Sequence, residues 1–153
     1  MKKILVVAHA PSQNTQAMVD AVIEGICHPE LSGVTVSWLP PLQAQSQQVI
    51  ECDGIILGTT ENLGYMSGAL KDFFDRIYYP CLELCQGKPM ATFIRAGHDG
   101  TGTKRAIDSI CTGLKWRPVM ETLICRGPWQ EDFLPACQEL GTTFAAGLEA
   151  GIF

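Results

Sequence analysis

Residues 4–26 read ILVVAHAPSQNTQAMVDAVIEGI, and this stretch decides the fold. The run from Ile4 to Ala8 is continuously apolar and rich in β-branched residues, which is typical of a central parallel strand covered on both faces. Pro11 to Thr15 follow, and several of these residues favour helix N-caps. From Gln16 onward the apolar residues recur with a helical period on one face: Met18, Val19, Val22, Ile23 and Ile26. The stretch therefore predicts a buried strand that turns directly into a helix.

Strands and helices alternate along the rest of the chain. Apolar runs predict further strands at Val34–Leu39, Asp53–Gly58, Pro89–Arg95 and Pro118–Cys125. Helical periodicity predicts helices at Gly68–Tyr79, which Pro80 would end or kink, and at Thr103–Lys115 and Glu131–Gly147, while Gln43–Ile50 suits a short helix or an ordered loop. Alternation of this kind implies a parallel sheet with helices on both faces, and right-handed crossovers leave few topologies. We therefore expect an α/β fold with five parallel strands and one domain, residues 1–153.

Composition narrows the class of protein. The 153 residues suit one domain, and with 46% hydrophobic and 18% charged residues the chain can build a core. The net charge of −5 and the scattered positions of the 11 basic residues disfavour nucleic acid as a partner. The apolar N-terminal run is too short to span a membrane, and a polar turn follows it in place of a clean cleavage site. We expect a cytoplasmic protein without a membrane span.

Cysteine and histidine give no sign of a metal site. The seven Cys include no CxxC pair, and the three His stand at no ligand spacing from them. In a core-rich chain of this length we expect reduced thiols, several of them buried. One redox-active Cys stays open as an alternative.

Three loops are expected to meet where a ligand would bind. In an open parallel sheet, ligands bind beyond the carboxyl ends of the strands where the strand order reverses. For the order 2-1-3-4-5, the first loop (Pro11–Thr15), the second loop (Thr59–Ser67) and the third loop (Ala96–Gly102) converge there. In the first loop, side chains of Ser12, Asn14 and Thr15 can donate hydrogen bonds, and the starting helix attracts an anion. Because the loop has neither a P-loop lysine nor a glycine trio, a single terminal phosphate fits it best; ordinary helix capping is the alternative.

The second and third loops have unusual compositions. In the second, Gly64 permits a backbone conformation closed to other residues, and Asn62 can present an amide to a heterocycle. Tyr65 and Met66 form an apolar wall for a ligand or simply cover the edge of the core. The third loop has three glycines in six residues, which suits a close approach of backbone and ligand. His98 either contacts a ring or handles a proton there, or it is an ordinary solvated side chain.

Taken together, the three loops resemble those of flavodoxin-like FMN proteins, in particular NAD(P)H-dependent FMN reductases and flavodoxin-family oxidoreductases. The family's first loop reads S-x-x-G-N-T; Ser12, Asn14 and Thr15 match it, and Gln13 replaces the glycine. Its second loop reads P-x-x-x-G-x-x-S/P-G-x-L-K-x-x-x-D and is matched by TENLGYMSGALKDFFD at residues 60–75, which begins with Thr where proline is usual. The third loop is glycine-rich in both, here with Gly97 and Gly100.

The resemblance implies a fold, a cofactor and a set of residues. The fold would be a flavodoxin-like three-layer sandwich with strand order 2-1-3-4-5, and the cofactor FMN. The phosphate would bind at Ser12, Asn14, Thr15 and Gln16. The ring would lie between the other two loops, at Thr60, Glu61, Asn62, Leu63, Gly64, Tyr65, Met66, Gly97, His98 and Gly100. The flavin N5 would carry out the chemistry, so no catalytic side chain is expected.

The resemblance also implies an activity: transfer of electrons from NAD(P)H to a quinone, a flavin or a similar small-molecule acceptor, by a homodimer or homotetramer. The alternative is a flavodoxin-type carrier that passes single electrons between proteins, and a divergent member with a different activity is a third. Carriers show a strongly acidic face around the flavin, whereas Glu61 and Asp99 are the only acids of the second and third loops. Trp129 either lines a substrate pocket or covers the surface.

Overall fold

The opening stretch forms the predicted strand, turn and helix. In the computed structural model, which describes residues 1–153, it gives β1 (Lys2–Ala8) and α1 (Gln13–Ile26). Residues 4–8 are almost completely buried, and α1 buries the apolar face that its periodicity predicts. Ser12 caps α1, since its Oγ accepts a hydrogen bond from the Thr15 N–H at 3.1 Å. The prediction for this stretch is confirmed.

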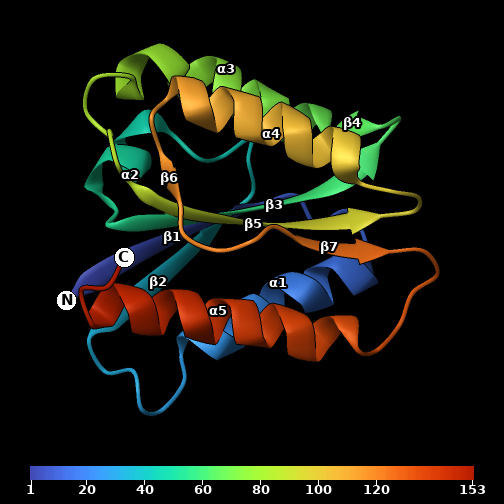
Figure 1. Cartoon of the computed structure of the whole chain (residues 1–153), viewed down its shortest axis with the longest axis horizontal. Coiled ribbons are helices and arrows are strands. Elements are labelled where there is room, and N and C mark those ends of the chain that lie inside the picture. Colours follow the sequence, from blue (N-terminus) through green and yellow to red (C-terminus); the bar gives the residue numbers. More distant parts are fainter.

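The remaining elements complete a three-layer α/β sandwich. They are β2 (Val34–Leu39), α2 (Ser46–Glu51), β3 (Gly54–Asn62), β4 (Tyr65–Met66), α3 (Gly68–Cys81), β5 (Pro89–Ala96), α4 (Thr101–Gly113), β6 (Arg117–Pro118), β7 (Leu123–Arg126) and α5 (Phe133–Glu149). The sheet order is β2-β1-β3-β5-β6, with β7 also paired to β5. As Figure 1 shows, α1 and α5 cover one face of the sheet, and α3 and α4 cover the other. The predicted fold class and strand order are confirmed.

The fifth predicted strand is divided in two. We expected one strand over Pro118–Cys125, but β6 and β7 are separate, and each pairs in parallel with β5. Val119 and Met120 both pack against the core on the side of α1 and α5. Consecutive side chains on one face break the alternation that a regular strand requires, so the strand is interrupted there. The prediction of five strands therefore holds only for the main architecture, because the sheet has seven.

The second loop is largely a β-hairpin. β3 was expected to end at Gly58, but it continues to Asn62 and pairs in antiparallel fashion with β4, matching Asn62 to Tyr65. Leu63 and Gly64 form the turn, with φ values of 53° and 77°. Positive φ at both central residues is the pattern of the two-residue turn that suits the twist of a hairpin. The polar composition of residues 59–62 concealed this extension of the strand.

Helix boundaries differ from the predicted ones by a few residues. α3 continues to Cys81 with Pro80 inside it, although we expected Pro80 to end or kink it. The missing N–H of Pro80 removes a hydrogen bond only from the last turn, where its loss costs the helix least. α4 and α5 each begin and end about two residues away from the predicted positions.

Two core layers hold the helices against the sheet. On one side, α1 and α5 cross with almost no space between them: a Cβ on Gly25 would lie 2.0 Å from the Gln138 carbonyl oxygen, and one on Gly141 would lie 2.1 Å from that of Val22. This contact fixes α1, and so the position of its N-terminus.

All seven cysteines are free thiols, and all except Cys27 are buried. None of the helices combines the length and the apolar character needed to cross a bilayer.

Candidate functional site

The three loops lie at the carboxyl edge of the sheet, on the right in Figure 1. The His9 N–H donates to the Gly58 carbonyl at 3.0 Å, which ties the chain before the first loop to β3. A Cβ on Gly102 would lie 2.8 Å from the Gly64 carbonyl oxygen, so the hairpin turn rests on the first turn of α4. The structure thus brings the predicted loops together at one edge.

In the first loop, the hydroxyl groups of Ser12 and Thr15 bind one another. Their oxygens are 2.8 Å apart, and the Ser12 N–H donates to Thr15 Oγ1 at 3.0 Å. Together with the bond from the Thr15 N–H to Ser12 Oγ, this forms a capping box. Thr15 is only 7% exposed. Ser12 therefore caps the helix, and the Thr15 hydroxyl is less accessible to a ligand than the sequence suggests, whereas Ser12 is exposed.

The main chain of the same turn carries donors without partners. The N–H groups of Gln13 and Asn14 have no acceptor within the chain, and the first turn of α1 contains no acid. The turn borders a hollow of about 430 Å³, whose far side is lined by Gln16 and Asp20 of α1. Unpaired N–H groups and the positive end of the helix dipole make this end suitable for an anion. Gln16 is engaged elsewhere: its side-chain amide donates to Asp20 Oδ1 at 3.0 Å and its N–H to the Ser12 carbonyl at 2.9 Å.

The hairpin presents a mixed surface at the edge of the site. Thr60 Oγ1 donates to Asn62 Oδ1 at 2.8 Å, which leaves the Asn62 NH₂ group for a ligand. Leu63 is fully exposed and Tyr65 is 40% exposed. Met66 is only 2% exposed and packs in the core, so its side chain faces away from the site. The apolar surface of the hairpin is formed by Leu63 and Tyr65.

Glu61 joins the hairpin to the third loop. Its Oε1 accepts from the His98 N–H at 3.2 Å, and its Oε2 accepts from the Gly100 N–H at 2.8 Å. Gly100 is the N-cap of α4 with φ 74°, and a Cβ there would lie 2.6 Å from Ile124 Cγ2. A Cβ at Gly97 would meet nothing within 4 Å. Gly100 thus has a structural role, whereas Gly97 leaves open space at the site.

The other acid of the third loop is also engaged. Asp99 is hydrogen-bonded through its carboxylate to the Thr101 hydroxyl. Arg126 Nε donates to the Asp99 carbonyl at 2.5 Å and lies 3.8 Å from its carboxylate. The His98 ring lies in an exposed position. The acids of both loops are therefore bound within the chain.

Two residues at this edge were not identified from the sequence. His9 follows β1, and its partial burial lowers its pKa, because the charged form loses hydration. Arg95, the one charged residue of β5, donates through Nη1 to the Ala96 and Cys125 carbonyls at 2.9 and 3.1 Å. Its guanidinium lies 5.1 Å from the Phe133 ring and 5.8 Å from that of Trp129. This cluster favours the covering role for Trp129. The sequence did contain a signal for Arg95, because it is the one charged residue near the end of an otherwise apolar strand.

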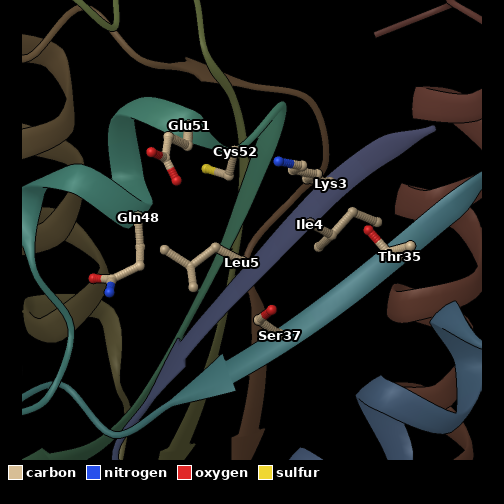
Figure 2. Close-up of a pocket in the computed structure, with 8 residues that line it drawn as sticks. All are labelled: Lys3, Ile4, Leu5, Thr35, Ser37, Gln48, Glu51 and Cys52. Atoms are coloured by element: carbon tan, nitrogen blue, oxygen red, sulfur yellow. The ribbon is translucent and has the colours of Figure 1, made fainter.

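A second hollow lies near the opposite edge of the sheet. Figure 2 shows its lining, which includes Thr35, Ser37, Gln48 and Cys52, around about 250 Å³. The Cys52 thiol donates to the Val49 carbonyl at 3.2 Å, and burial raises its pKa to about 11. Lys88 Nζ donates to the Cys52 carbonyl at 2.6 Å. This hollow has neither a reactive thiolate nor a helix N-terminus, so the carboxyl edge is the better candidate.

Comparisons with known proteins show what this chain is similar to. The family described as NADPH-dependent FMN reductase matches residues 5–126. A flavodoxin from Aquifex aeolicus (strain VF5) is 27% identical over 161 residues, which cover 95% of this chain and 86% of that protein. Among solved structures, a flavodoxin from the domain Archaea is similar with a TM-score of 0.81 at 23% identity, over 96% of this chain and 99% of that one. The flavodiiron protein from Giardia intestinalis gives 0.80 at 16% identity, over 98% of this chain and 37% of that one.

Proposed function

The chain belongs to the NADPH-dependent FMN reductase family, and from this premise we propose that it transfers electrons from NAD(P)H to a quinone, a flavin or a similar small-molecule acceptor. The family to which the chain belongs and its flavodoxin relative identify it as a flavodoxin-like FMN protein. The observation that carries the proposal is the N-terminus of α1, where two unpaired N–H groups meet no acid. Such an end binds a phosphate without lysine or arginine.

The residues of the carboxyl edge fit FMN. The N–H groups of Gln13 and Asn14 would hold the phosphate, with Ser12, Asn14, Thr15 and Gln16 as the predicted side-chain partners; Gln16 would first have to leave Asp20. The ring would lie between the second and third loops, near the Asn62 amide and the open space at Gly97. When bound, FMN supplies an N5 atom that accepts hydride. The chain holds and orients it, and donors of the hairpin turn would stabilise negative charge on the ring.

The charges around the site favour a small-molecule acceptor over a protein partner. Protein carriers use complementary charged surfaces to find their partners. Here Glu61 binds the N–H groups of the third loop, and Asp99 is bound to Thr101 and Arg126. Glu61 faces the third loop and Arg126 lies 3.8 Å from the exposed Asp99 carboxylate, so these two acids do not form a concentrated acidic face. A flavodoxin-type carrier is the second candidate, favoured by the 27% identical relative that is named a flavodoxin.

A turnover assay separates the two candidates. The FMN-loaded protein is mixed with NADH or NADPH and a quinone, and the nicotinamide absorbance is followed, with FMN alone as the control. The reductase predicts oxidation of one nicotinamide well above the rate with free FMN. Absence of turnover with both nicotinamides would overturn it. Two well-separated one-electron steps in a potentiometric titration would then support the carrier.

The wider organisation is also part of the proposal. We propose that residues 1–153 form one domain, and that it assembles as a homodimer or homotetramer. The exposed Leu63 and Tyr65 at the hairpin support a covering partner beside the site. The seven free thiols support a reducing compartment such as the cytoplasm. Light scattering coupled to size-exclusion chromatography tests the assembly, and a monomer at micromolar concentration would contradict it.

A further inference from the structure

The carboxylate of Glu61 bridges two segments that are distant in the sequence. It leaves the end of β3 and accepts hydrogen bonds from the main-chain N–H groups of His98 and Gly100, at 3.2 and 2.8 Å. Each carboxylate oxygen thus has its own donor in the third loop. Bonds between a carboxylate and main-chain N–H groups are charge-assisted and stronger than neutral ones.

The two bonds act on segments that are already constrained at their far ends. The Gly64 carbonyl faces Gly102, so the hairpin turn rests on α4. Gly100 is the N-cap of α4, and Ile124 packs against it. Glu61 therefore adds the link that fixes the distance between the hairpin and the third loop. It also places a negative charge at the positive end of α4, which is a favourable position for an anion.

We propose that Glu61 is a positioning residue: it fixes the gap between the second and third loops before the flavin binds, and its charge makes the bound flavin harder to reduce. The proposal rests on the proposed function, since the ring is placed between these loops. A reduced flavin gathers negative charge, and a fixed carboxylate nearby disfavours that charge. Oxidised FMN carries no such charge on its ring, so Glu61 disfavours only the reduced form.

The first arm of the test uses the protein without FMN. Hydrogen exchange of the His98 and Gly100 amides is measured by NMR in the wild type, in Glu61→Gln and in Glu139→Gln. Glu139 is an exposed residue of α5, and its variant makes the same charge change away from the site. We expect roughly tenfold faster exchange of these amides in Glu61→Gln alone, since a neutral amide replaces two strong acceptors with one weaker acceptor. Equal exchange in all three proteins would overturn the positioning role.

The second arm measures the affinities for oxidised and reduced FMN. In Glu61→Gln we expect their ratio to shift about tenfold toward the reduced form, which is about 30 mV for a two-electron couple. Glu61→Asp keeps the charge with a shorter side chain, so its potential should stay near that of the wild type even where its amides exchange faster. An equal potential in Glu61→Gln, Glu139→Gln and the wild type would overturn the electrostatic role.

The two arms separate this proposal from the proposed function. A wild type that does not bind FMN would overturn the proposed function and the effect of Glu61 on the potential. The exchange measurement would still decide whether Glu61 fixes the two loops. A thermal melt of each variant identifies a loss of folding, in which case Glu61→Asp decides the exchange arm, because it loses reach while keeping its charge.

Discussion

Two helices begin at the same edge of the sheet, and only one of them has a carboxylate of the chain bound at its N-cap. The first turn of α1 has no acid, and the N–H groups of Gln13 and Asn14 find no acceptor in the chain. At α4, the Glu61 carboxylate accepts from the Gly100 N–H, and Asp99 binds Thr101. Both ends carry the same helix dipole. The N–H groups of Thr101, Gly102 and Thr103 in α4 have no acceptor within the chain either, but the Glu61 carboxylate beside them disfavours a second anion, so α1 is the better place for an external one.

The largest effect is expected from adding an acid to the open end. Asn14→Asp places a carboxylate where the phosphate would bind, and repulsion between close charges should lower the affinity for FMN about 100-fold or more. The same carboxylate interacts well with the helix dipole, so the apoprotein should be as stable as the wild type or slightly more stable. Asn14 is the better choice than Thr15, which is buried and bound to Ser12.

A matched control adds the same charge elsewhere. Gln86→Glu changes an exposed turn before β5, at the opposite edge of the sheet. Its affinity for FMN, measured by quenching of flavin fluorescence, should match that of the wild type. If both variants bound FMN like the wild type, the end of α1 would not be the phosphate site.

The next effect concerns the N-cap of α4, where Glu61 is bound. Gly100→Ala puts a side chain on a residue with φ 74° and against Ile124 Cγ2, so we expect a loss of about 1–3 kcal/mol in the free energy of unfolding. Gly97→Ala, three residues earlier, meets nothing within 4 Å and should change the stability by less than about 0.5 kcal/mol. Urea denaturation of the apoproteins measures both. Equal losses would show that α4 does not depend on its N-cap glycine.

The smallest effect depends on pH and on the residue before the first loop. Burial lowers the pKa of His9 from its ordinary value of 6.5, so near this pH the unfolded chain binds more protons than the folded one. Stability should therefore fall as the pH drops below about 6.5, until the folded protein also takes up the proton. His9→Gln should reduce this slope between pH 7.5 and 5, as measured by urea denaturation. His98→Gln, at the exposed third loop, is the control; an unchanged slope in His9→Gln would contradict the assignment.

Sequence patterns were sufficient for the architecture and less so for the site. Apolar runs and helical periods predicted the alternating elements, because burial on one or both faces leaves a local pattern. They could not show that Val119 and Met120 both face one core layer and divide a strand. They also could not show that Met66 points inward while Leu63 is exposed, since both are apolar residues of one hairpin.

The role of Glu61 was outside the reach of local patterns for a different reason. Its partners, the N–H groups of His98 and Gly100, are main-chain groups 37 and 39 residues away. Any residue except proline carries such a donor, so no side-chain motif in the sequence indicates the contact. The sequence placed Glu61 at the site, and only the three-dimensional arrangement shows what its carboxylate binds.

The most direct measurement compares the affinities of the protein for FMN and for riboflavin, which lacks the phosphate. If the N-terminus of α1 holds the phosphate, FMN should bind with micromolar affinity or tighter, and about 100-fold or more tightly than riboflavin. Quenching of flavin fluorescence on titration with apoprotein gives both constants. Equal affinities for the two flavins would contradict a phosphate site at Ser12–Thr15.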